Sequence, residues 1–217
     1  MHVVIIGGNK GIGLALVKKF LSHGHRVSVT CRETSQELAA TQAKIITDID
    51  VTKEETTRTL SQKIGDIDML IHCAGVLISD SLDKIDISNI SKQFEVNALG
   101  PLKTFLSLRK NLKKGSKVGF LTSRMGSIED NTSGGQYGYR TSKTALNAIA
   151  KSLAVDLKPS EIAVFLLHPG YVKTSMTNYN GLIETDESAD GLYDIMMTKS
   201  LEDSGSFWHT NGEQLPW

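Results

Sequence analysis

The stretch HVVIIGGNKGIG, residues 2–13, decides the fold class of this chain. Its apolar run His2–Ile6 is typical of a strand that is buried on both faces of a sheet. Apolar residues then recur at helical spacing from Gly11 to His23. Glycines in such a strand-to-helix turn let the backbone approach a phosphate, which the helix attracts through its N-terminal N–H groups and positive dipole end. The residues predicted to hold a nucleotide here are Gly7, Asn9, Lys10, Gly11, Ile12 and Gly13.

The same alternation of apolar strands and helices continues along the chain. Further strands are predicted at Arg26–Cys31, Ala43–Thr47, Met69–His72, Lys117–Thr122, Ile162–Leu167 and Ser206–Trp208. Further helices are predicted at Lys53–Lys63, Ile87–Leu112, Tyr139–Leu157 and Ser188–Leu201. Continuous apolar strands joined by helices indicate a parallel sheet covered on both faces, and right-handed crossovers favour a doubly wound order. We therefore predict one α/β domain of Rossmann type over residues 1–217.

Composition excludes several other classes of protein. The 217 residues carry 24 lysines and arginines against 24 aspartates and glutamates, so no global field attracts nucleic acid or an anionic membrane. No apolar run approaches the roughly 18 residues that span a bilayer. The two cysteines, Cys31 and Cys73, are expected on strands about 10 Å apart, beyond disulfide reach, which favours free thiols and a cytoplasmic location. The six histidines show no metal-ligand spacing, so we expect no metal.

The tip of the second strand indicates which dinucleotide is bound. A carboxylate is typical at this position in NAD-binding sheets, where it contacts the adenosine ribose. This chain instead has Arg32, whose guanidinium can form a bidentate contact with a 2′-phosphate, and Lys10 lies at the same corner. Both cations could equally be solvated surface residues. Their convergence favours NADP(H) over NAD(H).

Six motifs in order resemble the short-chain dehydrogenase/reductase family over nearly the whole chain. They are the glycine turn, the pair Asp50-Val51, the turn His72-Cys-Ala-Gly75, Asn97, the Y-x-x-x-K pattern Tyr139–Lys143, and the loop His168–Thr174. Ser123-Arg-Met-Gly-Ser127, residues 137–147 and the final Leu215-Pro-Trp217 are similar to its C-factor and sniffer-like carbonyl reductase branch. The resemblance adds these residues to the predicted nucleotide site: Arg32, Asp50, Val51, Cys73, Ala74, Gly75, Tyr139, Lys143, Pro169, Gly170, Val172 and Thr174.

The resemblance also implies a catalytic set, namely Asn97, Ser123, Tyr139 and Lys143. Tyr139 would exchange a proton with the substrate oxygen, and Lys143, four residues along the same helix, is expected to lower the phenol pKa. Ser123 would hydrogen-bond the substrate oxygen and Asn97 would hold a water in a proton relay. The family serine usually lies 13 residues before the tyrosine, where this chain has Gly126. We favour Ser123, at a strand end, over Ser127.

The implied activity is NADP(H)-dependent interconversion of a carbonyl and an alcohol in a homodimer. The short loop Ser175–Asp186 suggests an open pocket for small aldehydes or ketones. The alternative is a regulatory protein of C-factor type that binds a dinucleotide with little turnover. A nucleic-acid binder on this scaffold lacks a basic stripe or an aromatic platform.

Overall fold

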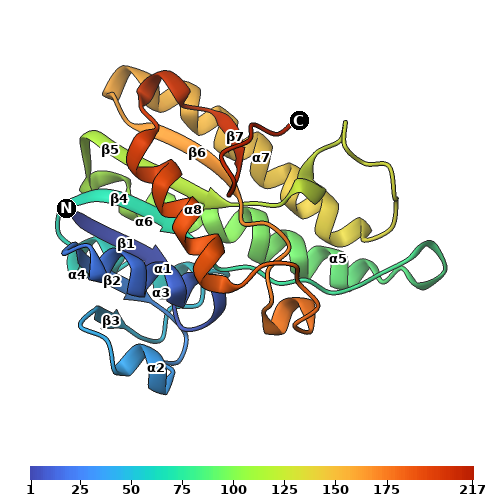
Figure 1. The fold of residues 1–217 in the computed structure, drawn as a ribbon, viewed down its shortest axis with the longest axis horizontal. Helices are drawn as coiled ribbons and strands as arrows, with labels where there is room; N and C mark the ends of the chain where they lie inside the picture. The colour runs from blue at the N-terminus through green and yellow to red at the C-terminus, as the bar shows by residue number, and fades with distance from the viewer.

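A seven-stranded parallel sheet forms the centre of the computed structural model, which describes residues 1–217 (Figure 1). The strands lie in the order β3-β2-β1-β4-β5-β6-β7, and every neighbouring pair is parallel. They are β1 (His2–Ile6), β2 (Arg26–Thr30), β3 (Lys44–Ile46), β4 (Ile67–His72), β5 (Leu112–Leu121), β6 (Ala163–His168) and β7 (Ser206–His209). The predicted doubly wound α/β fold in one domain is confirmed.

Helices cover both faces of the sheet and divide the core into two layers. One layer packs under α1 (Gly11–Ser22), α2 (Gln36–Ala39) and α8 (Thr185–Thr198). The other packs under α4 (Leu60–Lys63), α6 (Gly100–Leu108) and α7 (Tyr137–Leu157). Two further helices are α3 (Glu54–Thr57) and α5 (Ile87–Phe94). None of the helices has the length and apolarity needed to cross a lipid bilayer.

Strand β1 shows why an unbroken apolar run is required at the centre. All five of its residues are buried. Successive side chains of a strand point to opposite faces, so Val3 and Ile5 enter one core layer while Val4 and Ile6 enter the other. A polar residue at any of these four positions would leave an unpaired group in the core.

Two of the predicted helices are wrong in detail. Residues 53–63 form two separate turns of helix, α3 and α4. The predicted helix over 87–112 is interrupted by a π-helical turn, η2 (Glu95–Leu99), and its last residue already belongs to β5. Pro101 gives the physical reason, because it has no N–H and its ring would clash with the carbonyl four residues earlier in an α-helix. That carbonyl belongs to Asn97, inside the π-helical turn.

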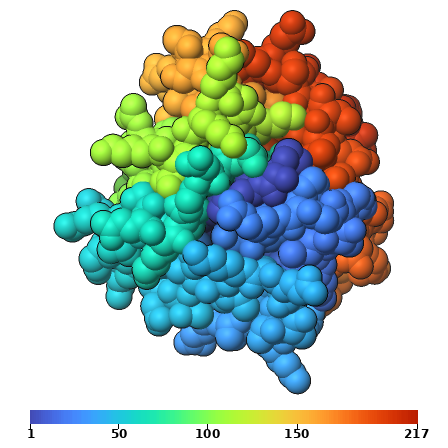
Figure 2. All heavy atoms as spheres, turned by 90° about the vertical axis from the view of Figure 1, so that its left-hand side faces the viewer, coloured from blue at the N-terminus to red at the C-terminus, as the bar shows by residue number.

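Parallel strand direction places the functional segments at one edge of the sheet. The segments that leave β1, β2, β4, β5 and β6 at their carboxyl ends begin with Gly7, Cys31, Cys73, Thr122 and Pro169. Figure 2 shows the opposite edge, where the start of the chain lies near the centre, between segments coloured light blue and those coloured teal and green. The sites predicted from the sequence therefore lie at the carboxyl edge, as expected for a doubly wound sheet.

Helix α8 is expected to tolerate no side chain at Gly191. A Cβ atom there would lie 1.9 Å from the backbone oxygen of Thr210. Glycine-to-alanine changes in helices usually stabilise by about 0.5–1 kcal/mol, but overpacking should make Gly191→Ala lower the free energy of unfolding by roughly 1–3 kcal/mol. Urea denaturation would measure this, with Gly65→Ala as the control because its Cβ meets nothing within 4 Å. A Gly191→Ala protein as stable as the control would contradict the packing of α8.

Candidate active site

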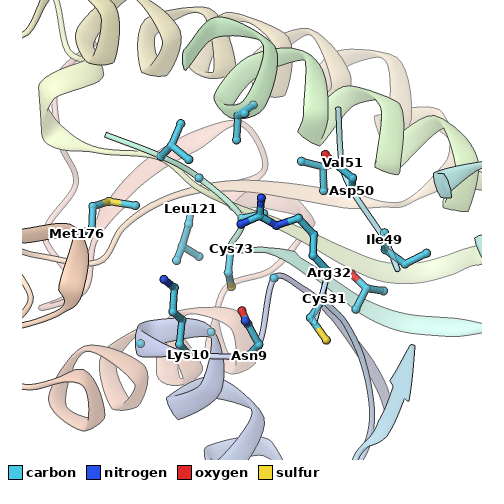
Figure 3. Close-up of a pocket in the computed structure, with 18 of the residues that line it drawn as sticks. Asn9, Lys10, Cys31, Arg32, Ile49, Asp50, Val51, Cys73, Leu121 and Met176 are labelled. Atoms are coloured by element: carbon cyan, nitrogen blue, oxygen red, sulfur yellow. The ribbon is translucent and has the colours of Figure 1, made fainter. Parts of the chain in front are cut away.

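A cavity of about 830 Å³ runs along the carboxyl edge above β1, β2 and β4 (Figure 3). Most residues of the predicted nucleotide site line it. They are Gly7, Asn9, Lys10, Gly11, Ile12, Gly13, Arg32, Asp50, Val51, Cys73, Ala74, Gly75 and Thr174. The segments that follow five strands, β1, β2, β3, β4 and β6, therefore meet at one cavity.

The glycine turn leaves space that any side chain would fill. Gly7 has φ +84°, and a Cβ there would lie 2.8 Å from the Ala74 backbone. A Cβ at Gly13 would lie 2.3 Å from the Gly7 oxygen. No side chain caps the first N–H groups of α1. These donors and the bare turn fit the pyrophosphate of a dinucleotide.

Two unpaired cations face the adenosine end of the cavity. The side chains of Arg32 and Lys10 are exposed and form no hydrogen bond or ion pair within the chain. In Figure 3 the Arg32 side chain extends across the cavity and Lys10 points into it from the glycine turn. Burial opposes ionisation of Asp50, but hydrogen bonds from Thr52 and the nearby Arg32 hold the pKa of its carboxyl below the usual range. Arg32 and Lys10 thus supply positive charge at this end of the cavity, which the ionised Asp50 offsets in part.

The predicted catalytic side chains lie beside the far end of this cavity. Tyr139 and Lys143 are both buried on α7, and Ser123 is buried just after β5. The Ser123 hydroxyl lies close enough to the phenol of Tyr139 to lower its pKa. The Lys143 Nζ donates to the backbone oxygen of Leu121, a cavity residue, at 2.9 Å, and a Cβ on Gly75 would lie 3.6 Å from it. Serine, phenol and ammonium thus form one group next to the cavity.

Burial controls the ionisation of this group. Burial raises the pKa of Tyr139 to about 12, and the nearby Ser123 hydroxyl offsets this only in part. Burial also lowers the pKa of Lys143 to about 8, although the neighbouring Cys73 thiol opposes the shift. The expectation that Lys143 lowers the phenol pKa is therefore wrong for this arrangement: its Nζ lies 5.7 Å from the Tyr139 ring centre and donates to a carbonyl instead. Tyr139 is a protonated donor at neutral pH.

Ser127, the alternative serine, is committed elsewhere. Its Oγ accepts from the backbone N–H of Asp130 at 3.1 Å, within its own loop. The Ser123 Oγ accepts from Met125 N at 3.2 Å, which leaves its hydroxyl proton for Tyr139 or a ligand. The structure thus brings Ser123, not Ser127, to the phenol.

Asn97 lies in the π-helical turn and is fully buried. Its Oδ1 accepts from Val76 N at 2.8 Å, and its Nδ2 donates to Val76 O at 2.8 Å and to Ser142 Oγ at 3.0 Å. Its side chain is therefore occupied in holding the loop after β4 against α7. The predicted water relay would have to use its backbone oxygen.

Five residues of the predicted nucleotide site do not line the cavity: Tyr139, Lys143, Pro169, Gly170 and Val172. Val172 is buried and pairs with Ile183 in a short parallel bridge. The Pro169 oxygen accepts from Ser188 Oγ. The segment does reach the glycine turn at Thr174, whose Cγ2 lies 3.4 Å from a Cβ built on Gly11.

Sequence reasoning missed several cavity residues. Glu33 follows Arg32 at the adenosine end, and its carboxylate opposes a 2′-phosphate. A residue next to a predicted one, such as Glu33, can be inferred from its neighbour. Nothing in the sequence links Lys92 of α5, or Glu95 and Val96 of η2, to this cavity. The missed residues are Thr30, Cys31, Glu33, Ile49, Thr52, Val76, Lys92, Glu95, Val96, Leu121, Ser175 and Met176.

His72 and Cys73, at the end of β4, carry no charge at neutral pH. Burial lowers the pKa of His72 to about 3, and its Nε2 has no partner. Burial raises the pKa of the Cys73 thiol to about 12. Both cysteines are free, as predicted.

Comparison with known proteins agrees with this geometry. The family model for short chain dehydrogenases matches residues 1–182. A 1-hydroxy-2-glutathionyl-2-methyl-3-butene dehydrogenase from Rhodococcus sp. (strain AD45) is 35% identical over 223 residues, which covers 99% of each chain. C-signal from Myxococcus xanthus is 37% identical over 156 residues, covering 70% of this chain and 94% of its own.

Solved structures extend the likeness to the whole fold. The carbonyl reductase Sniffer of D. melanogaster superposes with a TM-score of 0.93 at 28% identity, covering 100% of this chain and 99% of its own. A short-chain dehydrogenase/reductase from Burkholderia multivorans with bound NADP superposes with a TM-score of 0.91 at 26% identity and the same coverage. The motifs, the sheet order and these matches agree: the chain belongs to the short-chain dehydrogenase/reductase family of oxidoreductases and resembles its sniffer and C-factor branch.

Proposed function

We propose that this protein is an NADPH-dependent carbonyl reductase in which Tyr139 protonates the substrate oxygen. The observation that carries the proposal is the buried contact of Ser123, Tyr139 and Lys143 at the end of a dinucleotide-sized cavity. Family membership and the likeness to carbonyl reductase Sniffer support it.

The residues present divide the reaction between them. A nicotinamide dinucleotide supplies the hydride when bound. The Ser123 hydroxyl donates a hydrogen bond to the substrate oxygen as negative charge develops on it. The phenol of Tyr139 then transfers its proton to that oxygen, and its raised pKa keeps the phenol protonated at neutral pH.

Lys143 supports the same proton transfer. Its ammonium is fixed by the Leu121 oxygen and lies beside Gly75 at the cavity end, where it is placed to hold a ribose hydroxyl. A ribose held there would fix the nicotinamide beside the Tyr139 phenol, so Lys143 would act by positioning the cofactor rather than through its charge on the phenol.

The proposal extends to cofactor choice and assembly. Arg32 and Lys10 would bind the 2′-phosphate of NADPH, and the carboxylates of Glu33 and Asp50 oppose that phosphate in part. NADP in the Burkholderia relative is consistent with this preference. We also propose a homodimer, because Phe94 on α5, Leu106 on α6 and Val155 on α7 expose apolar side chains that a second copy would cover.

A regulatory protein of C-factor type is the less favoured alternative. It would need the nucleotide cavity alone, whereas this chain also buries an ammonium and a phenol at an energetic cost. The substrate side has exposed apolar side chains at Met176, Tyr179 and Leu182, which suit an apolar aldehyde or ketone.

Tyr139→Phe should remove the proton donor and leave the fold intact. The rate of NADPH oxidation at 340 nm with a panel of aldehydes and ketones should fall by roughly 10²- to 10⁴-fold. The NADPH dissociation constant should stay close to that of the wild type. Equal turnover by the two proteins would contradict the assignment of Tyr139 as the acid.

Arg32→Ala and Glu33→Gln should change cofactor preference in opposite directions. Loss of the guanidinium removes a charge-assisted contact of about 1.5–3 kcal/mol, so the ratio of NADPH to NADH affinity should fall by roughly 10- to 100-fold. Glu33→Gln removes a repulsive charge and should raise that ratio. Titration of both variants with both nucleotides measures it, and an unchanged ratio in Arg32→Ala would exclude the phosphate contact.

The buried ammonium of Lys143 predicts how stability depends on pH. Its folded pKa of about 8 lies below the ordinary 10.5, so between pH 8 and 10 the unfolded chain binds more protons and stability rises with pH. Relative to Lys143→Met, the wild type should gain roughly 2–3 kcal/mol between pH 7 and 10. Urea denaturation at several pH values tests this. Parallel stability curves for the two proteins would mean that the ammonium is not buried.

A further inference from the structure

The segment Gly75–Asp80, which follows β4, has no regular secondary structure. At two alternate residues, Val76 and Ile78, the backbone N–H and C=O groups are nevertheless both hydrogen-bonded. Val76 exchanges two hydrogen bonds with the Asn97 side chain, and Ile78 exchanges two with the Gln93 side chain. Both amide side chains are fully buried. They are four residues apart and so lie on one helix face. We call this segment, with its two amide clamps, the strap.

The next residue in this alternation, Asp80, contacts the helix that carries Tyr139 and Lys143. Its carboxylate accepts from Tyr137 N at 2.5 Å and from Gly138 N at 2.9 Å. Its backbone oxygen accepts from Gln136 N at 3.2 Å. Asp80 thus satisfies the donors just before Tyr139 from 57 residues away in the chain.

Helix α7 has no local cap that could replace this contact. The N-cap residue Gln136 has φ 52° and makes no side-chain cap bond, whereas cap residues usually adopt extended backbone. Gly134 and Gly135 before it also have positive φ. Of these three left-handed residues only Gln136 carries a side chain that disfavours the conformation, and the backbone N–H groups at 136–138 are bound by Asp80.

The fit between the strap and α7 is close. A Cβ on Gly138 would lie 2.3 Å from Gln93 Nε2 and 3.1 Å from Asp80 Oδ2. Gly138 lets the first turn of α7 rest directly on the clamp residues. The strap begins at Gly75, which lies beside the cavity and Lys143 Nζ. It ends at Asp80, which contacts the backbone of Gly138, the residue before Tyr139.

We propose that Asp80 is a positioning residue: through the strap it fixes the first turn of α7 and so sets Tyr139 relative to Ser123 and the cavity. Its role in turnover rests on the proposed carbonyl reductase function, whereas its role in fixing the helix does not. Asp80 itself takes no part in the proton transfer.

The test compares Asp80→Ala, Asp80→Asn and Gly138→Ala with Asp86→Ala. Asp86 caps α5 through Ser88 N at 2.8 Å, and this helix start carries no proposed catalytic group, so its loss is a matched capping control. We expect kcat to fall by on the order of 10²-fold in Asp80→Ala, since a displacement of about 1 Å costs that much. KM and NADPH affinity should change little. Asp80→Asn, which keeps an acceptor oxygen, should recover part of kcat.

Gly138→Ala disturbs the same contact from the helix side and should reproduce the loss of kcat. If Asp80→Ala and Gly138→Ala are folded and as active as Asp86→Ala, the proposal is wrong. A drop in kcat in Asp86→Ala equal to that in Asp80→Ala would also overturn it, because helix capping in general would then explain the result.

Hydrogen exchange separates this inference from the proposed function. In the protein alone, the amides of residues 137–143 should be protected in the wild type and Asp86→Ala and should exchange faster in Asp80→Ala. Unchanged protection in Asp80→Ala would overturn the inference, whatever the activity. If the wild type reduces no carbonyl, the proposed function fails, and the exchange result alone decides whether Asp80 positions Tyr139.

Discussion

The common direction of the seven strands is the constraint on which the rest of the structure depends. Because all pairs are parallel, the segments after β1, β2, β4, β5 and β6 leave the sheet at one edge. The bare turn at Gly7, the Arg32 cation and the Ser123 hydroxyl gather there although far apart in the chain. Parallel strands need crossover helices, and α7 is the crossover that brings Tyr139 and Lys143 to the same edge. The parallel direction of the strands thus accounts for both the position of the cavity and the position of the polar side chains beside it.

Features with local causes could be predicted from the sequence. The unbroken apolar run at β1 and the glycines after it determine a buried strand and a bare turn within a dozen residues. Arg32 is predictable because it occupies a strand tip, and Tyr139 and Lys143 because their Y-x-x-x-K pattern, with five other motifs in order, resembles the short-chain dehydrogenase/reductase family. Ser123 could be favoured over Ser127 for the same kind of reason, its place at a strand end.

Features that depend on distant contacts could not be predicted. The π-helical turn at Asn97 reflects Pro101 and the loop held by the asparagine side chain, and helical periodicity does not reveal either. The raised pKa of Tyr139 follows from burial, which the Tyr139–Lys143 spacing does not report. The Asp80 contact with α7 spans 57 residues. Each of these features depends on residues that are distant in the sequence and meet only in the folded chain.

Burial has opposite effects on the pKa values of the two ionisable groups of the site: it raises that of Tyr139 and lowers that of Lys143. The phenol of Tyr139 stays protonated, ready to donate, while the ammonium of Lys143 is held by the single Leu121 oxygen and is easily discharged. Burial of the phenol and the ammonium lowers the free energy of unfolding of the protein. The same groups would stabilise the charge that develops on a bound substrate. The neutral His72 beneath it adds no competing charge.

Calorimetric titration with NADPH tests the central claim most directly, namely that the cavity above the glycine turn holds the cofactor. The account predicts saturable binding with one equivalent per chain for the wild type. It also predicts no binding for a folded Gly7→Val variant, whose side chain would meet the Ala74 backbone within 3 Å. Absence of binding to the wild type, or equal binding to both proteins, would contradict it.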